Sequence, residues 1–435
     1  MGLDQYDFIL AQFVDINGSP KTKLVPVRSA SQLFAQGVGF AGFAVKGMGL
    51  EPHESEYIAK GDESTLRPMT WMPRTGVVQC RGMGDDRLHP IDSRNICERI
   101  SLEFKEETGS EVFTGLEPEF FLLRRNPNGE IVPALEDDTL DKPCYDYRGL
   151  LGVKDFLFDL NESLSAANID VYQIDHEDSN GQYEINFRYD KCLNTADKFT
   201  FFKMALAGIA DKHNYIPSLM PKPFSSRTGN GMHLHISIGD SQLPNRFSDN
   251  TDARGMGLSE EGYHFLSGIL HHAESLTAIS CPSINSYKRL IAKGSDSGAT
   301  WAPAYISYGY NNRTAMVRIV DNHLEIRTPD SMANPYLLTA AVIISGLDGI
   351  RNRYDLPKPI NENLYSLPER QLRDLGIKRL PRDLKESLAS FRNNRVFYES
   401  LGEEFCDTFV KTKEMEWHDF MSQVSPWEIE RYLRL

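Results

Sequence analysis

The sequence predicts an α+β protein with two unequal parts, and three observations support this. Short β-rich runs with glycine and proline between them fill about the first 90 residues. From residue 113 onward, strands and helices are interspersed without the regular alternation of a βαβ fold. The last part of the chain reads as a series of helices. We therefore expect a small β domain over residues 1–92 and a larger α+β domain over residues 93–435.

The elements follow from local patterns. In the first part, strands are expected at residues 8–14 and 23–27, with a turn between them. A polar, turn-prone segment, residues 83–92, ends this part and places the domain boundary there. In the second part, helical spacing predicts helices over residues 94–107, 153–167, 196–213, 263–277 and 334–347.

The composition is that of a globular protein. Of 435 residues, 40% are hydrophobic, which is enough for a well-packed core. The formal net charge of −14 and the lack of a Lys/Arg-rich run argue against a nucleic-acid partner. Six cysteines lie far apart without CxxC or CxxH spacing, which signals neither zinc nor disulfides. Because no signal segment or membrane span is evident, we expect a cytoplasmic protein with no membrane partner.

Glu117 and Glu119 stand two residues apart at the start of an apolar, β-rich run. Side chains at this spacing project from the same face of a strand, so both carboxylates would enter one enclosed space. Two carboxylates about 4 Å apart repel by roughly 4 kcal/mol at an effective dielectric constant near 20. The pair therefore predicts a bound metal or a shared proton.

Further segments carry polar side chains at similar spacing. They contribute His233, His235 and Ser237 from one strand, Glu325 and Arg327 from another, and Glu177 and Glu184 from either side of a short turn. One such pair is usually ordinary surface alternation, but four segments beside apolar runs weaken that interpretation. Five carboxylates and an imidazole in one cavity would be satisfied by two or more divalent cations. Oxygen-rich ligation with a single nitrogen favours Mg²⁺ or Mn²⁺ over zinc.

A cationic set accompanies the acids, namely Arg289, Arg313, Arg318 and Arg327. Arginine grips carboxylate and phosphate with two parallel hydrogen bonds, although any one of these could be a surface ion pair. The chain has no P-loop and no GxGxxG signature. Metals and arginines together favour phosphoryl transfer by positioning and charge neutralisation.

Six motifs in order carry a resemblance to the glutamine synthetase family over essentially the whole chain: residues 115–121, 181–184, 222–235, 285–290, 312–313 and 334–336. The resemblance implies a small N-terminal β-grasp domain and a larger catalytic α+β domain with a curved antiparallel sheet. It implies ATP-dependent formation of γ-glutamyl phosphate from L-glutamate, followed by attack of an amine. It also implies a homo-oligomer, commonly a dodecamer of two hexameric rings, with active sites between subunits.

The resemblance assigns roles residue by residue. ATP and two or three Mg²⁺ or Mn²⁺ ions per site would be the cofactors. Glu119, Glu177 and Glu184 would bind the first metal, and Glu117, His233 and Glu325 the second. Gly229, Arg289 and Arg327 would bind L-glutamate, Arg313 would bind substrate and neutralise the transferring phosphoryl group, and Tyr189, His235, Ser237 and Arg318 would contact the nucleotide.

The departures from the family concern the amine. Ala41 stands where the family has an aspartate that helps bind and deprotonate ammonium, and Phe43 and Ala44 replace two serines. Glu56 keeps an acid nearby, and Asp296 is the nearest counterpart of a catalytic flap glutamate. An ammonium ion needs acceptors for four N–H donors, whereas an alkylammonium has fewer donors and a methyl group that favours apolar contact.

These changes resemble the subgroup of glutamate-amine ligases that makes γ-glutamylmethylamide, so we favour methylamine as the nucleophile. The alternatives are ammonia, as in a glutamine synthetase, a polyamine or ethanolamine, or a catalytically silent assembly. Retention of six metal-ligand positions and four arginines argues against the silent alternative. Residues 363–368 resemble a segment that is adenylylated in some family members, but their flanks differ, and we expect no modification of Tyr365.

Overall fold

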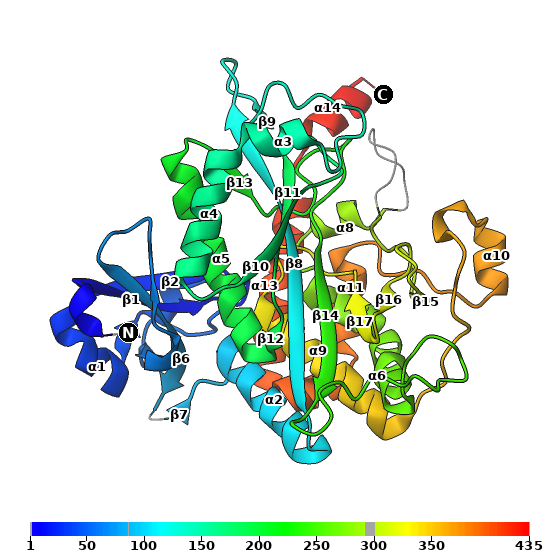
Figure 1. Cartoon of the computed structure of the whole chain (residues 1–435), viewed down its shortest axis with the longest axis horizontal. Coiled ribbons are helices and arrows are strands. Elements are labelled where there is room, and N and C mark those ends of the chain that lie inside the picture. The colour runs from blue at the N-terminus through cyan, green and yellow to red at the C-terminus, as the bar shows by residue number, and fades with distance from the viewer. Residues whose placement is uncertain (1, 86, 292–300, 435) are drawn as a thin grey trace.

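The computed structural model describes residues 2–85, 87–291 and 301–434. Two sheets lie side by side in Figure 1, a small one formed by the first residues of the chain and a large one through the middle of the molecule. The mixed α+β class predicted from the sequence is therefore confirmed.

The first sheet is mixed, in the order β2-β1-β6-β4-β3, with β1 and β6 parallel and the other neighbours antiparallel. Helix α1 packs on it over a core that includes Ile9, Phe13 and Tyr57. This is the β-grasp arrangement. Its strands are β1 (Phe8–Val14), β2 (Pro20–Pro26), β3 (Val38–Phe40), β4 (Tyr57–Gly61), β5 (Arg67–Pro68), β6 (Thr75–Gly84) and β7 (Arg87–Leu88), with helix α1 (Ala30–Ala35) and 3₁₀ turns η1 (Leu3–Gln5), η2 (Val27–Ser29), η3 (Gly42–Ala44) and η4 (Glu63–Thr65).

The large sheet curls around the middle of the molecule (Figure 1) in the order β10-β11-β8-β14-β17-β16-β15. Its neighbours along this path are antiparallel except β15 and β16, which are parallel. Its strands are β8 (Glu111–Arg125), β9 (Ile131–Pro133), β10 (Val171–His176), β11 (Gln182–Phe187), β12 (Asp190–Lys191), β13 (Ile216–Ser218), β14 (Met232–Gly239), β15 (Tyr308–Tyr310), β16 (Val317–Val320) and β17 (His323–Ile326).

The helices of this part pack around the sheet, and most contribute to the main core, but those over residues 369–374 and 426–432 do not. They are α2 (Ser93–Thr108), α3 (Tyr147–Gly152), α4 (Lys154–Ala166), α5 (Cys192–Lys212), α6 (Glu260–His271), α7 (Ala273–Ser280), α8 (Ser286–Arg289), α9 (Pro335–Asn352), α10 (Glu369–Asp374), α11 (Leu384–Arg392), α12 (Arg395–Leu401), α13 (Glu403–Met421) and α14 (Pro426–Tyr432), with the 3₁₀ turn η5 (Leu364–Ser366).

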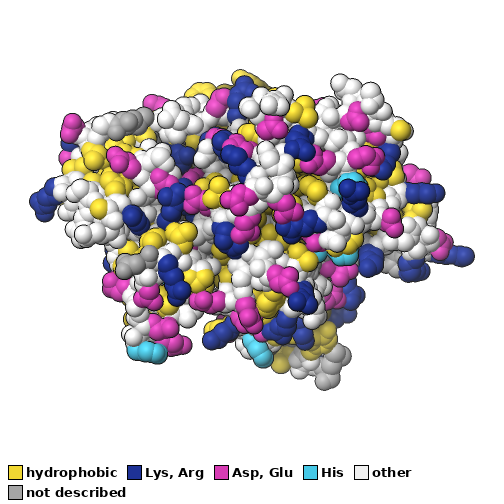
Figure 2. Space-filling view, turned by 90° about the horizontal axis from the view of Figure 1, so that it is seen from below, with side chains coloured by type: hydrophobic (Ala, Val, Ile, Leu, Met, Phe, Trp, Pro, Cys, Tyr) yellow, Lys and Arg dark blue, Asp and Glu magenta, His cyan; other side chains and the backbone are white. Residues whose placement is uncertain are grey.

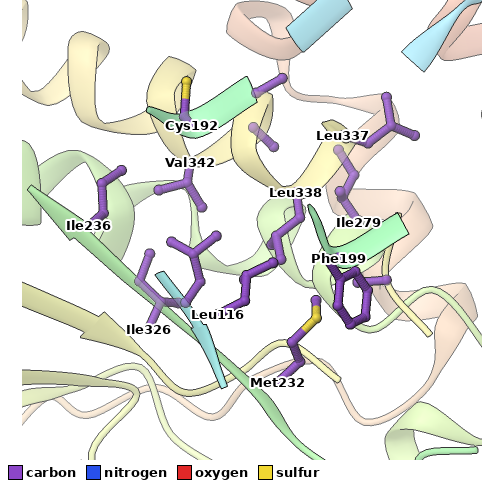
Figure 3. Packing of buried hydrophobic residues seen from close by; sticks show 14 of the residues in the cluster. Leu116, Cys192, Phe199, Met232, Ile236, Ile279, Ile326, Leu337, Leu338 and Val342 are labelled. Carbon is purple, nitrogen blue, oxygen red and sulfur yellow. The ribbon is translucent and has the colours of Figure 1, made fainter. Parts of the chain in front are cut away.

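Helix α9 is buried along most of its length and anchors the sheet. Asn334 caps its N-terminus by accepting hydrogen bonds from the backbone N–H groups of Tyr336 and Leu337. Figure 3 shows Leu338 of α9 packed beside Leu116 of β8, and the next residue, Glu117, lies on the opposite face of the strand and lines the cavity described below. The hydrophobic face of β8 thus fixes the position of its acidic face.

The prediction of one helix over residues 263–277 is wrong, because α6 ends at His271 and α7 begins at Ala273. His272 lies between them, with its Nε2 2.8 Å from Asp348 Oδ2 and its Nδ1 2.9 Å from Asn394 Nδ2. Among the described residues, no helix combines the length and apolarity needed to cross a bilayer. On the face in Figure 2, acidic and basic side chains are interspersed, so that view presents no continuous basic stripe.

Candidate active site

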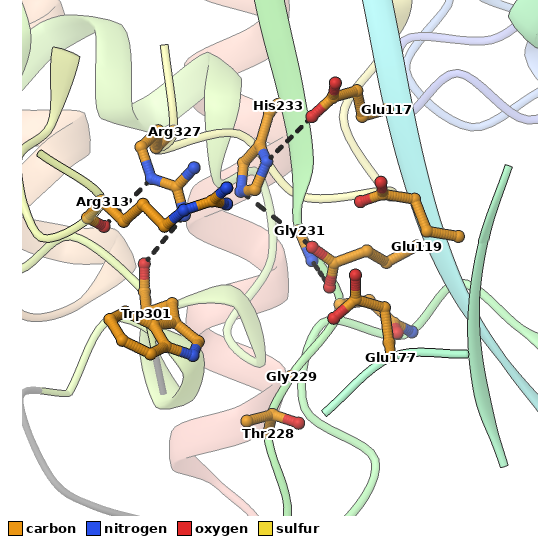
Figure 4. Close-up of polar contacts among 12 residues, drawn as sticks. Glu117, Glu119, Glu177, Thr228, Gly229, Gly231, His233, Trp301, Arg313 and Arg327 are labelled. Carbon is orange, nitrogen blue, oxygen red and sulfur yellow. Dashed lines mark hydrogen bonds and ion pairs between the residues drawn. The ribbon is translucent and has the colours of Figure 1, made fainter. Parts of the chain in front are cut away.

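A cavity of about 440 Å³ lies over β8, β11 and β14. Four glutamates line it: Glu117 and Glu119 from β8, Glu184 from β11, and Glu177 from the turn after β10. Figure 4 shows Glu117, Glu119 and Glu177 on one side of the space, Arg313 and Arg327 on the other, and His233 between them. The expectation that the separate motifs converge in space is confirmed.

Strand pairing explains how the acids meet. β8 pairs with β14 on one side, which places Glu117 opposite His233. It pairs with β11 on the other side, which places Glu119 opposite Glu184. The i, i+2 spacing on β8 therefore sends both carboxylates into one cavity but gives each a different neighbour.

Glu117, His233 and Glu325, expected from the resemblance to bind the metal on the nucleotide side and called the nucleotide-side group below, are already partly neutralised by the protein. His233 Nδ1 lies 3.4 Å from Glu117 Oε2 and 3.4 Å from Glu325 Oε1. Burial opposes ionisation of Glu325, but Arg327 and the two nearby histidines outweigh it and lower the pKa of Glu325 to about 2. Burial likewise opposes ionisation of Glu117, but hydrogen bonds from His233 and His235 lower its pKa.

Glu119, Glu177 and Glu184, expected from the resemblance to bind the metal on the glutamate side and called the glutamate-side group below, lack such compensation. Burial raises the pKa of Glu177 well above its ordinary value, and the charge of Glu119 raises it further. Burial also raises the pKa of Glu184, with added repulsion from Glu177, Glu117 and Glu119. Glu119 accepts hydrogen bonds at Oε2 from the backbone N–H of Gly231 (2.8 Å) and from Gln182 (3.1 Å). These donors are neutral, so the group favours binding of a cation.

The nucleotide-side group fits a divalent cation, and so do Glu119 and Glu184 of the glutamate-side group together with His233, whereas Glu177 is in neither set. In the sets Glu117, His233, Glu325 and Glu119, Glu184, His233, one ligand atom per residue can be chosen so that the atoms lie within 4.8 Å of one another. Two oxygens on opposite sides of Mg²⁺ lie about 4.2 Å apart, so small side-chain movements would suffice. His233 directs Nδ1 at Glu117 and Glu325, whereas its Nε2 is 4.0 Å from Glu119 Oε1. The ring therefore belongs to the nucleotide-side group.

The four predicted arginines all line the same cavity: Arg289, Arg313, Arg318 and Arg327. Glu325 holds two of them, with Oε2 2.9 Å from Arg318 Nη1 and Oε1 2.5 Å from Arg327 Nη1. Arg289 donates hydrogen bonds to the backbone oxygens of Thr328 (2.8 Å) and Arg327 (3.0 Å). Within the described ranges, the Arg313 side chain makes no hydrogen bond or ion pair, so its guanidinium is available to a ligand in the cavity.

Gly229 lines the cavity at a point where no side chain fits. A Cβ atom there would lie 2.2 Å from the backbone oxygen of Pro221. The same is true of the neighbouring Gly231, where a Cβ would lie 2.8 Å from Arg289 Nη2 and 3.0 Å from Glu119 Oε1. The backbone of this loop can therefore approach a ligand closely.

The residues predicted to contact the nucleotide divide between two cavities. Tyr189, His235 and Ser237 line a neighbouring cavity of about 530 Å³, whereas Arg318 lines the first. His235 connects the two, since its Nε2 lies 3.1 Å from Glu117 Oε1 and its Nδ1 lies 2.7 Å from Nε2 of His323. Tyr189 is 70% exposed and presents its ring at the rim of the second cavity.

Several residues of the first cavity were missed by the sequence analysis. Asp178 follows Glu177 directly, and Trp301 and Cys144 give hydrogen bonds to its carboxylate. Burial outweighs these hydrogen bonds and raises the pKa of Asp178. Tyr145, which has a positive φ of 63°, lines the same side of the cavity. The position of Asp178 beside Glu177 was the only available signal, because the others come from distant segments.

The residues expected to form the amine site are not in this cavity. Every described lining residue is numbered between Glu117 and Arg327, so the first sheet contributes none. Ala41 is exposed between β3 and η3, and Glu56 is also exposed. Asp296 lies outside the described residues. Tyr365 donates a hydrogen bond from its hydroxyl to the backbone oxygen of Ala302, another lining residue, at 2.5 Å.

Comparison with known proteins gives a consistent result. Residues 90–432 match the family described as "Glutamine synthetase, catalytic domain". The chain is 48% identical to glutamate–methylamine ligase of Methyloversatilis universalis, over 99% of this chain and 97% of that protein. It is 37% identical to glutamine synthetase of Rhizobium meliloti, over 97% and 95% of the two chains. A solved structure titled "GmaS/ADP complex-Conformation 1" superposes with a TM-score of 0.92 at 35% identity, covering 99% of this chain and 97% of that one.

Proposed function

The chain belongs to the glutamine synthetase family, and from this premise we propose that it is an ATP-dependent ligase joining the γ-carboxyl group of L-glutamate to methylamine. The reaction class is supported chiefly by one observation: glutamates line one side of the cavity and arginines line the other. Methylamine as the acceptor is supported by the 48% identical relative and by Ala41 in place of the family's aspartate.

In this proposal, the two acidic groups bind Mg²⁺ or Mn²⁺ and divide the work. The nucleotide-side group would hold the ion near the ATP phosphates, and the glutamate-side group would hold the ion near the acceptor carboxylate. Bound ions would supply charge neutralisation for phosphoryl transfer. The number of ions, two or three, is part of the proposal.

The arginines position and neutralise the reacting groups. Arg313 meets the transferring phosphoryl group, because its guanidinium faces the cavity without a protein partner among the described residues. Arg289, Arg327 and Gly229 bind L-glutamate, and Arg318 contacts the nucleotide together with the residues of the neighbouring cavity, His235, Ser237 and Tyr189. ATP phosphorylates the γ-carboxylate and leaves as ADP.

The amine step needs a base, because methylamine is protonated at neutral pH. Asp178 accepts this proton, since burial raises the pKa of its carboxyl group and, unlike Glu177, it is not assigned to a metal ion. The neutral nitrogen then attacks the γ-carbonyl carbon, the bond from that carbon to the phosphate oxygen breaks, and inorganic phosphate leaves. The resemblance also assigns Asp296 to this step, as the nearest counterpart of the family's flap glutamate.

We also propose the assembly and location implied by the family. The assembly is a dodecamer of two hexameric rings in which Ala41 of one subunit approaches the amine site of the next. The domain boundary at residues 92 and 93 is supported by the separation of the two sheets. A cytoplasmic location is supported by six cysteines that are all unpaired.

The test is a panel of amines at fixed ATP and L-glutamate, scored by phosphate release and by mass spectrometry of the product. We expect release that requires glutamate and rises far more with methylamine than with ammonia. Ethanolamine and putrescine provide the comparison for larger acceptors. An equal or greater response to ammonia would favour a glutamine synthetase, the second candidate, which the 37% identical relative supports. Absence of glutamate-dependent release with any amine would contradict the proposed reaction.

A further inference from the structure

A separate cavity of about 430 Å³ lies between the first sheet and helices α2 and α5. It takes no part in the proposed reaction, since it shares no lining residue with either cavity described above. Its lining is mainly polar and includes four cationic side chains: Arg67 of β5, Arg81 of β6, Arg94 of α2 and Lys198 of α5.

Three of these cations are paired with carboxylates of the same cavity. Arg94 donates from Nε and Nη2 to the two oxygens of Asp197, at 2.9 and 3.0 Å. Its Nη2 also lies 3.2 Å from Asp62, which Arg81 approaches at 3.4 Å. The remaining pair joins the ammonium of Lys198 to Asp190 at 2.7 Å.

Arg67 is the exception. Among the residues that the structure describes, its guanidinium has no hydrogen bond and no ion pair, and its Nη1 atom has essentially no accessible surface. The Nη1 atom of Arg94 is also buried without an acceptor. Burial lowers the pKa of Arg67, and the like charge of Arg94 adds to this effect.

The nearest acids, Asp197 and Asp190, oppose this shift without cancelling it, and neither pairs directly with Arg67. Asp197 is engaged by Arg94 and also accepts a hydrogen bond from the Tyr336 hydroxyl at 2.7 Å. Asp190 is engaged by Lys198. Arg67 as a whole is half-buried, but a buried N–H donor without an acceptor is destabilising, and a bound anion would supply both the acceptor and the missing charge.

We propose that this cavity binds a small oxyanion, carrying a carboxylate or a phosphate group, between Arg67 and Arg94. Two guanidinium groups with free Nη1 donors match the planar or tetrahedral oxygens of such a group. The lining contains no aromatic residue, so a compact anion fits its chemistry better than a nucleotide base.

Binding of an oxyanion in this cavity would affect the proposed nucleotide site. Asp190 lines the oxyanion cavity and directly follows Tyr189, which lines the nucleotide cavity. The short strand β12, which begins at Asp190, pairs with Phe113 and Thr114 of β8, and both also line the nucleotide cavity. An oxyanion that repositions β12 would therefore change the affinity for ATP, which makes this an effector site.

The test uses thermal unfolding and calorimetric titration of the full-length protein with sodium phosphate, sulfate or succinate against chloride at equal ionic strength. At 100 times the Kd, we expect at least one oxyanion to raise the Tm by about 3 °C. The comparison among phosphate, sulfate and succinate identifies the preferred group. Because phosphate is also a reaction product, it can bind in the active site as well. The variant R313Q changes the proposed phosphate contact there, and it should keep the rise in Tm caused by the preferred oxyanion.

The variant R67Q should bind the oxyanion at least tenfold more weakly, and the control R74Q should respond like the wild type. Arg74 is an exposed arginine of the same sheet, paired with Asp7 at 2.6 Å. In chloride alone, R67Q should unfold at the same temperature as the wild type or higher, because it lacks the uncompensated charge. R67K keeps the positive charge but lacks the paired N–H donors of a guanidinium, so the oxyanion should raise its Tm only weakly.

Three results would overturn the proposal. They are an R67Q variant that binds the oxyanion like the wild type, a wild type that responds equally to all four anions, and an R67Q variant that is clearly destabilised in chloride. None of these depends on the identity of the amine or on turnover.

Discussion

Replacement of Glu119 by glutamine tests two effects of the acidic cavity separately: the charge repulsion that destabilises the metal-free protein, and the binding of a metal ion. Glu119 and Glu184 are both buried, with candidate ligand oxygens within 4.8 Å of each other. At an effective dielectric constant of about 20, two full charges at this distance repel by about 3.5 kcal/mol. Because the pKa of Glu184 is already raised, protonation relieves part of this repulsion in the metal-free protein. We therefore expect E119Q to be more stable than the wild type by about 1–2 kcal/mol without metal.

The same substitution should remove the response to metal. Glutamine can still accept the hydrogen bonds from Gly231 and Gln182, so the fold around it is kept. It lacks the charge that a hard divalent cation requires. In chelator, E119Q should unfold at a higher temperature than the wild type. In about 5–10 mM Mg²⁺, chosen for an affinity on the order of millimolar, the wild type should unfold at the higher temperature. Phosphate release by E119Q should fall by at least about 1000-fold.

The control is E130Q, which changes an exposed glutamate whose Oε2 accepts a hydrogen bond from Asn126 at 2.8 Å. It should match the wild type in both buffers and in turnover. An E119Q protein that keeps full activity would refute the assignment of Glu119 to a metal. An E119Q protein that is less stable than the wild type in chelator would refute the electrostatic reasoning.

Four further outcomes are expected. Glu177 and Glu184 have folded-state pKa values above their unfolded values. The metal-free protein should therefore lose stability as pH rises from about 4.5 through those raised values. In thermal unfolding, Mg²⁺ should reduce this dependence of Tm on pH. R313Q should lower kcat by about 1000-fold in the phosphate-release assay, with little change in ADP affinity. D178N should lower kcat/KM for methylamine by about 100-fold, and least at high pH. A41D should raise the ratio of kcat/KM for ammonia to that for methylamine, measured on the same amine panel.

Local patterns predicted the elements that place the catalytic acids. A β-rich run followed by a turn predicted strand 8–14, which the structure reproduces as β1. Alternation placed Glu117, Glu119 and His233 on strands that face one cavity. These predictions succeed because side-chain direction in a strand depends only on parity. The helix break at His272 was not predictable in this way, since it depends on Asp348 and Asn394, which are distant in sequence.

The same limit applies to the site. Trp301 and Cys144 reach the cavity from segments without a repeating pattern, and their contacts with Asp178 depend on its position in the folded chain. The unpaired guanidinium of Arg67 was also invisible in the sequence. It becomes evident only when the acids around it are seen to be engaged by other residues. Which charged groups pair with one another is determined by the packed structure and not by the local sequence pattern.

Pro118, between the two glutamates of β8, explains how one strand can carry them both. β8 pairs with β14 up to Pro118 and with β11 from Glu119 onward. Proline has no N–H to donate, and Met232 opposite it gives its own N–H to the backbone oxygen of Pro329 at 2.9 Å. Pairing with β11 therefore begins only after Pro118, whereas on the β14 side Glu119 still donates its backbone N–H to the Gly231 oxygen at 3.1 Å. Glu117 is left with the cationic neighbours that lower its pKa, and Glu119 with the acids that favour a metal.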